Sequence, residues 1–169
     1  MPRKVRPIRI CGDVAFVPLT KGYESIIDSA DVSLVDCYNW FALPINSTVY
    51  AARSDYSGKK MRMVYVHRTI MGEPDGLQVD HRDGGGLNNR RGNLRVATSS
   101  QNMRNRRISS SNTSGFKGVY LSKTIGKWCA QITISHKQKH LGTFTSPEEA
   151  HAAYCRASEQ YHGEFGRTE

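Results

Sequence analysis

The sequence lacks acidic residues over a long stretch, because none occurs between Asp83 and Glu148. The formal net charge of the 169 residues is +9. An uncompensated basic segment is typical of proteins that bind polyanions, so we expect a nucleic acid as the partner. The basic residues of this window are Arg90, Arg91, Arg95, Arg104, Arg106, Arg107, Lys117, Lys123, Lys127, Lys137 and Lys139.

Other absences argue against a membrane protein, a secreted protein and a protein built on zinc or disulfides. There is no long apolar run and no strongly amphipathic basic helix, so we expect no membrane partner. The N-terminal stretch MPRKVRPIRI has no apolar core of a signal peptide, which favours a cytoplasmic protein. Cys11, Cys37, Cys129 and Cys155 show no CxxC spacing, so neither a zinc site nor a disulfide framework is expected. We expect them to be small buried residues in a reducing compartment.

The periodicity predicts an α+β chain whose first half has two parts. Residues 1–66 form a β-rich scaffold, with a strand at 14–19, a short helix at 29–37 and a hairpin from 48–53 and 60–66. Residues 67–107 form a second part, in which short strands at 78–80 and 93–97 flank a Gly/Asn loop. Thr98 and Gln101 fit a capping box that begins a helix.

The second half is predicted to be a sheet with one helix. Residues 108–114 have linker composition, and strands are expected at 116–121, 127–134 and 139–144. Ser146, Pro147 and Glu149 form a strong helix start. Small residues and tyrosines then repeat at helical spacing as far as Gly163, a stripe that packs on the sheet of a domain at 115–167. No small-molecule cofactor is expected there.

The stretch DHRDGGGLNNRRGNL, residues 80–94, concentrates the chemistry. Cleaving a phosphodiester requires an activated nucleophile, charge neutralisation and stabilisation of the leaving group. Asp80 and the amide of Asn102 are oxygen ligands that suit a hard metal ion, and His81 can activate water. The glycines at 84–86 let a phosphate approach closely, and Arg90 and Arg91 could hold it. Asn88, Asn89 and Asn93 can shape the loop through hydrogen bonds.

Two alternatives for this loop fail. An EF-hand would need an oxygen ligand where Arg82 stands and a glutamate at the twelfth loop position. A serine or cysteine nucleophile would need an elbow motif, which surrounds none of these residues.

The segment VDHRDGGGLNNRRGNLRVATSSQNMRN resembles the HNH motif of phage and intron-encoded homing endonucleases, which have a ββα-metal fold. The resemblance implies Asp80 as metal ligand, His81 as general base, Asn93 as the loop-fixing asparagine and Asn102 as second metal ligand. Asn105 is the alternative ligand, and a structural role is expected for His67. The family implies one Mg²⁺ or Mn²⁺ per active site, and products with 5′-phosphate and 3′-hydroxyl ends.

The C-terminal half is similar to the APETALA/ethylene-response DNA-binding domain of plants, through GV at 118–119, GKW at 126–128, LGTF at 141–144 and EEA at 148–150. That resemblance implies a three-stranded sheet in the major groove of duplex DNA, backed by a helix. The side chains expected to face DNA are Lys117, Tyr120, Lys123, Lys127, Trp128, Gln131, Thr133 and Lys139. Lysines contact phosphate but lack the fork that reads guanine.

Together these features predict a DNA endonuclease of phage or bacterial origin, monomeric or weakly dimeric, that cuts one strand per active site. Arg104, Arg106 and Arg107 would follow DNA phosphates beside it. Two alternatives stay open: a non-catalytic DNA-binding regulator with a degenerate motif, and an RNA-binding protein that stacks bases on its Trp and Tyr residues.

Overall fold

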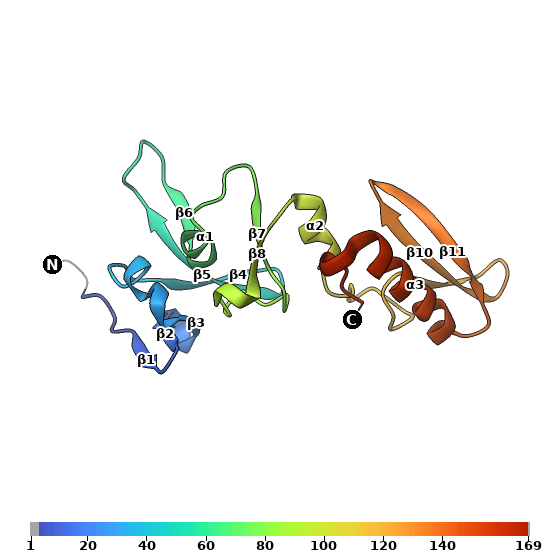
Figure 1. Cartoon of the computed structure of the whole chain (residues 1–169), viewed down its shortest axis with the longest axis horizontal. Helices are drawn as coiled ribbons and strands as arrows, with labels where there is room; N and C mark the ends of the chain where they lie inside the picture. Colours follow the sequence, from blue (N-terminus) through green and yellow to red (C-terminus); the bar gives the residue numbers. More distant parts are fainter. Residues whose placement is uncertain (1–3, 169) are drawn as a thin grey trace. The chain divides into compact units, whose positions relative to one another are not determined.

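The structure is a computed structural model that describes residues 4–168, and it divides into two compact units, Met1–Ser99 and Ser100–Glu169. The first three residues of the expected 1–66 region lie outside the described part. The structure combines several small antiparallel sheets with a few helices, which confirms the α+β class (Figure 1). Within residues 4–168, no helix is long and apolar enough to cross a bilayer.

The first unit is built from two three-stranded sheets and one strand pair, with orders β1-β2-β3, β4-β5-β6 and β7-β8. Its strands are β1 (Arg9–Cys11), β2 (Val14–Pro18), β3 (Glu24–Asp28), β4 (Phe41–Ile45), β5 (Thr48–Asp55), β6 (Arg62–Tyr65), β7 (Gln78–His81) and β8 (Leu94–Ala97). Its helical segments are the 3-10 turns η1 (Thr20–Gly22), η2 (Ser29–Leu34) and η3 (Arg91–Asn93), and helix α1 (Val66–Ile70). The predicted hairpin of β5 and β6 is confirmed, and the two short strands predicted around the Gly/Asn loop are present as β7 and β8, which pair antiparallel.

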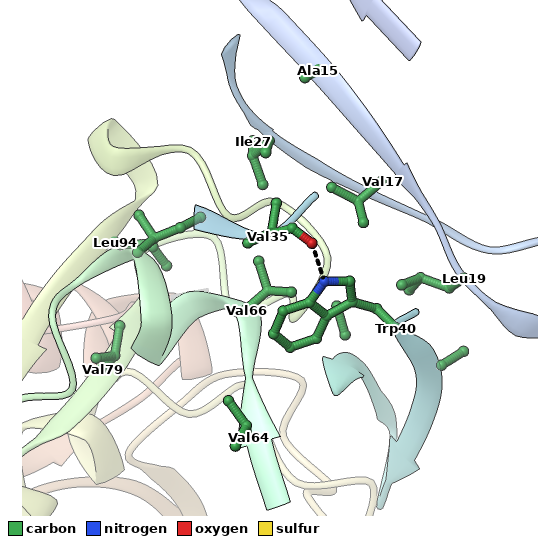
Figure 2. Packing of buried hydrophobic residues seen from close by; sticks show 13 residues of the cluster. Ala15, Val17, Leu19, Ile27, Val35, Trp40, Val64, Val66, Val79 and Leu94 are labelled. Atoms are coloured by element: carbon green, nitrogen blue, oxygen red, sulfur yellow. Dashed lines mark hydrogen bonds between the residues drawn. The ribbon is translucent and has the colours of Figure 1, made fainter. Parts of the chain in front are cut away.

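One hydrophobic cluster fills the first unit. Trp40 is 1% exposed at its centre, and its indole Nε1 donates a 2.9 Å hydrogen bond to the carbonyl of Val35 (Figure 2). The cluster runs from Ala15 to Val79 and Leu94 on the β7–β8 pair. The expected scaffold and the first two strands of the expected nuclease part therefore share a single core.

The second unit is a three-stranded antiparallel sheet, order β11-β10-β9, that packs on one long helix. Its elements are helix α2 (Ser99–Arg104), which begins at the unit boundary, β9 (Val119–Ser122), β10 (Lys127–Ile134), β11 (Lys137–Phe144), α3 (Pro147–His162) and the 3-10 turn η4 (Gly163–Phe165). The predicted start of α3 is confirmed, because the backbone N–H of Glu149 donates to Oγ of Ser146 at 3.2 Å.

The segment predicted to be a linker is hydrogen-bonded to its own unit. The Ser114 hydroxyl lies 2.9 Å from the carbonyl oxygens of Phe116 and Val119. The side chain of Asn112 donates to the Phe116 carbonyl at 3.0 Å. Polar composition at 108–114 thus reflects turns that pack on the sheet domain.

Gly86 has a different role from the expected one. A Cβ at this position would clash with the carbonyl oxygen of Val49 and lie 2.8 Å from Cδ1 of Tyr50. The missing side chain therefore allows the loop to pack against strand β5, whereas the sequence suggested close approach of a phosphate.

Substitution of this glycine tests the packing. We expect Gly86→Ala to lower the free energy of unfolding by about 1–3 kcal/mol, because the added methyl overpacks a site bounded by backbone. Gly92→Ala is the matched control, since a Cβ there meets nothing within 4 Å. Urea unfolding of both variants measures the difference, and equal midpoints would contradict the assignment.

Candidate active site

Strand β7 carries Asp80 and His81 into the interior of the first unit. Both are 4% exposed, although neighbours on a strand point to opposite faces. Antiparallel pairing with β8 sets Asp80 opposite Arg95 and His81 opposite Leu94. Two adjacent ionisable side chains are thus buried at the end of one short strand, an arrangement that requires specific partners.

Arg95 is the partner of Asp80. Its Nε and Nη2 lie 2.8 and 2.7 Å from Oδ2 of Asp80, and both side chains are almost fully buried. A buried charge requires such a counter-charge, and removal of one partner would leave the other uncompensated. Both contacts fall on one carboxylate oxygen of Asp80.

A chain of hydrogen bonds orients His81. Its Nε2 lies 2.8 Å from Oδ1 of Asn89, a fully buried residue. The amide nitrogen of Asn89 donates to Oγ of Ser25 at 2.6 Å, and Ser25 Oγ donates to the Leu87 carbonyl at 3.2 Å. Since this network turns the amide oxygen of Asn89 toward the ring, Nε2 carries the hydrogen and Nδ1 carries the lone pair of the neutral imidazole.

The electrostatic setting of His81 favours its neutral form. Burial lowers the pKa of this ring, while the hydrogen bond with Asn89 and the charges of Asp83 and Asp80 act in the opposite direction. A neutral imidazole is the form that accepts a proton.

A cluster of rings surrounds His81 on one side. The centroid of His67 lies 5.0 Å from that of His81, and Tyr50 lies 6.0 Å from His81 and 5.7 Å from His67. Burial lowers the pKa of His67 to about 3, with a smaller effect of His81 and Arg68. His67 Nδ1 is buried without a hydrogen-bond partner among residues 4–168. His67 is therefore a packed, neutral residue beside the site.

Asn93 bridges the two ends of the loop. Its Oδ1 accepts from the backbone N–H of Asp83 at 3.1 Å, and its Nδ2 donates to the carbonyl of Asn88 at 2.7 Å. The Asp83 carboxylate accepts from the N–H of Gly85 at 2.8 Å, which closes the turn. These contacts have the geometry that the loop-fixing role of Asn93 requires, and its part in catalysis stays a prediction.

The arginines at 90 and 91 are held by carboxylates from strand β3 and the 3-10 turn η2. Nε of Arg90 donates to Asp28 at 2.7 Å, and Nη2 of Arg91 lies 2.7 Å from Asp31. Burial raises the pKa of Asp28, but the hydrogen bonds of both arginines outweigh it and hold that pKa below its ordinary value. Both arginines thus have a structural role through these ion pairs, and their expected phosphate contact stays a prediction.

The remaining nuclease residues lie in the second unit. Asn102 is half-buried on α2 and Asn105, one residue past its end, is buried. Joint metal binding by Asp80 and Asn102 stays a prediction. Arg106 and Arg107 are exposed in the segment that follows.

The residues expected to face DNA on the C-terminal sheet divide into two groups. Tyr120, Lys123, Lys127 and Thr133 are exposed, as a contact surface requires. Trp128 instead packs on the cluster of Val119, Ala130 and Ala150. Lys127 and Trp128 are adjacent on one strand, so only one of them can face outward.

Three further side chains of that set contact other parts of the chain or are less exposed, and their contact with DNA stays a prediction. Nζ of Lys117 donates to the backbone carbonyls of Arg104 and Arg106, both at 2.6 Å. Lys139 is exposed and donates to the Tyr161 hydroxyl at 2.8 Å. Gln131 is half-buried. Cys11 and Cys37 are exposed rather than buried, while Cys129 is buried as expected.

Sequence reasoning missed the partners that fix the site. Ser25 and Asn89 are 64 positions apart, and no spacing rule connects them. The contact of Arg95 with Asp80 could have been predicted from the sequence, because position 95 lies opposite position 80 once β7 and β8 are paired in register.

Comparison with known proteins finds a matching family model and two related sequences. A family model described as HNH endonuclease matches residues 64–104. Protein 3.8 of Escherichia phage T7 is 38% identical over 96 residues, which cover 56% of this chain and 77% of that protein. An AP2/ERF and B3 domain-containing transcription factor of Arabidopsis thaliana is 52% identical over 48 residues, which cover 28% of this chain and 13% of the plant protein. No solved structure matches the chain.

The buried ring of His67 predicts a pH-dependent stability. Its pKa is about 3 in the folded chain against an ordinary value of 6.5, so the unfolded chain binds more protons between these values. The contribution to stability is complete above pH 6.5 and is lost as the pH falls toward 3, by at most roughly 1.4 kcal/mol per pH unit. We expect His67→Phe to reduce the loss of unfolding free energy between pH 7 and pH 5, measured in urea. Substitution of the exposed His140 should leave the loss unchanged, and an unaltered loss in His67→Phe would contradict the assignment.

Proposed function

Because the chain belongs to the family of phage T7 Protein 3.8 and contains an HNH endonuclease domain, we propose that it is a metal-dependent endonuclease of duplex DNA. It would hydrolyse phosphodiester bonds and cut one strand per active site. The observation that supports this most directly is the end of β7, where Arg95 fixes Asp80 and Asn89 fixes His81 in the interior. A scaffold alone has no need for two adjacent ionised or ionisable groups held in this way.

The donor atoms suit a hard divalent cation. Asp80 offers a carboxylate and Asn102 an amide oxygen, the ligand types that Mg²⁺ and Mn²⁺ prefer. The hydrogen bonds from Arg95 to Asp80 correspond to the outer contacts that orient metal-binding carboxylates. In this proposal Asp80 and Asn102 would hold one ion per active site. When bound, it would neutralise phosphate charge and stabilise the leaving oxygen.

His81 would act as the general base. Its neutral ring, with Nε2 held by Asn89, takes the proton of the attacking water at Nδ1. The amide oxygen of Asn89 keeps the hydrogen of His81 on Nε2. Asn93 stabilises the loop that carries Asn89 through its hydrogen bond to the Asn88 carbonyl. Tyr50 and His67 limit the rotation of the ring by packing beside it.

The second unit would bind the duplex. Tyr120, Lys123 and Lys127 are exposed on or beside the sheet, and Arg106 and Arg107 are exposed before it. Their charge suits phosphate contacts, and the similarity to a plant AP2/ERF protein supports a DNA-binding role. Linking two weak DNA-binding parts raises affinity through effective concentration.

Loss of the base should separate cutting from binding. We expect His81→Ala to slow nicking of supercoiled plasmid in Mg²⁺ by about 10²–10⁴-fold, the usual contribution of general-base catalysis, with duplex affinity nearly unchanged. His81→Gln guards against loss of packing in the buried site, and His140→Ala is an exposed histidine control. EDTA should abolish nicking by the wild-type chain. Equal cutting by wild type and both His81 variants would remove this residue from the mechanism, and no cutting by wild type would favour the DNA-binding regulator.

The choice between the two asparagines can be tested through the metal. We expect Asn102→Ala to raise the Mg²⁺ concentration for half-maximal nicking by about tenfold or more, because an inner ligand is lost. Asn105→Ala should leave that concentration unchanged, after correction for any loss of folded protein measured by circular dichroism. The opposite result would move the ligand to Asn105.

A further inference from the structure

A pocket of about 320 Å³ lies within the second unit, formed by residues of α2, β10 and α3. Arg104, Lys117 and His162 line it together with Met103, Gln131 and Tyr154. This volume falls at the lower end of the range for small-ligand sites. Mixed polar and apolar walls of this kind suit a ligand with a charged group and a less polar body.

The pocket forms where strand β10 extends beyond its neighbour β9. Strand β9 pairs with β10 only from Lys127 to Ala130, so the second half of β10 extends past its neighbour. The carbonyl oxygen of Gly118 accepts a 2.8 Å hydrogen bond from the backbone N–H of Gln131. His162 Nε2 donates a 2.9 Å hydrogen bond to the carbonyl of Thr133. The side chain of His162 therefore occupies the place of a missing strand partner and turns its other nitrogen away from the sheet.

Two buried nitrogen atoms in the pocket wall lack partners. Nε of Arg104 and Nδ1 of His162 make no hydrogen bond to any part of residues 4–168. His162 is 8% exposed. The Nε–H of Arg104 is a buried donor, and such donors rarely lack a partner in folded proteins; a bound ion or water is one of the standard explanations. Because His162 Nε2 carries the hydrogen that the Thr133 carbonyl accepts, His162 Nδ1 donates only when the ring is protonated, a form that a bound anion favours.

The charged side chains that line the pocket are basic. Among residues 4–168, no Asp or Glu lines it. Burial lowers the pKa of Lys117 to about 8, and Arg167 adds to this effect. Burial also lowers the pKa of His162, as do the charges of Arg104 and Lys117, while the bond to Thr133 opposes them. Clustered cations cost free energy in a partly buried site unless an anion joins them.

We propose that this pocket binds a phosphate group of the DNA backbone, with Arg104 Nε as donor and the Lys117 and His162 side chains beside it. The proposal rests on the proposed function for its partner, duplex DNA, and adds a contact apart from the exposed residues of the sheet. The apolar walls of Met103 and Tyr154 accommodate the adjoining sugar. The ammonium of Lys117 has three hydrogens, two of which the Arg104 and Arg106 carbonyls accept, so one can reach the ligand.

Inorganic phosphate tests the pocket independently of cleavage. In the full-length chain at constant ionic strength, NMR should show saturable shifts of the Arg104 Nε–H and His162 imidazole signals. Arg104→Gln and Arg104→Lys should both weaken this binding by roughly tenfold or more, since Lys keeps the charge but lacks the Nε–H donor. Arg156→Gln removes one exposed charge outside the pocket and should have no effect. Absence of shifts, or equal phosphate affinity in all variants, would overturn the phosphate site. Water would then be the expected partner of Arg104 Nε and His162 Nδ1.

Salt dependence of duplex binding tests the source of the phosphate. We expect Arg104→Gln to reduce the slope of log affinity against log salt by about 1, while Arg156→Gln keeps the wild-type slope. Phosphate binding with an unchanged slope would overturn the DNA backbone as the ligand. Failure of the wild-type chain to bind duplex at all would instead refute the proposed function, and the phosphate titration would still decide whether the pocket binds an anion.

Discussion

The contact between loop residues 87–89 and strand β3 is the constraint on which the site depends. Backbone bonds join Ile26 to Leu87 at 2.8 Å and Asn89 to Ile26 at 2.7 Å, and the Ser25 and Asn89 side chains continue this seam to His81. Because β3 is itself paired along β2, the imidazole is held by residues anchored in a sheet as well as by the loop that follows it. The N-terminal strands are thus part of the site, although they contribute neither base nor metal ligand.

Local patterns were sufficient to predict the elements and the identity of the reactive pair. The hairpin, β7, β8, the three C-terminal strands and the start of α3 follow from alternation and capping, which act over a few residues. The supports of the pair could not be predicted, because Ser25, Asp28 and Asp31 meet the loop only after long-range folding. Strands β1, β3 and β4 were missed for the same reason: they are short, and tertiary pairing rather than propensity stabilises them.

Composition also failed to separate basic residues with different roles. Arg90, Arg91 and Arg95 belong to the acid-free stretch of the sequence, yet carboxylates from before that stretch neutralise all three. Lys117 is used to hold the chain after α2. The positive charge of the acid-free stretch that can attract a polyanion is therefore smaller than its count of basic residues suggests.

The single hydrophobic cluster that extends from Ala15 to Leu94 has a consequence for the history of such chains. A recombination event that copied only the forty or so codons of the HNH motif would transfer a strand pair without the interior it packs on. Exchange near residue 100, where the two compact units meet, leaves both interiors whole. Gene shuffling among related elements should therefore preserve the first hundred or so residues, with Asn102 on α2 included, as one inherited block, while the sheet and α3 after them are replaced or lost.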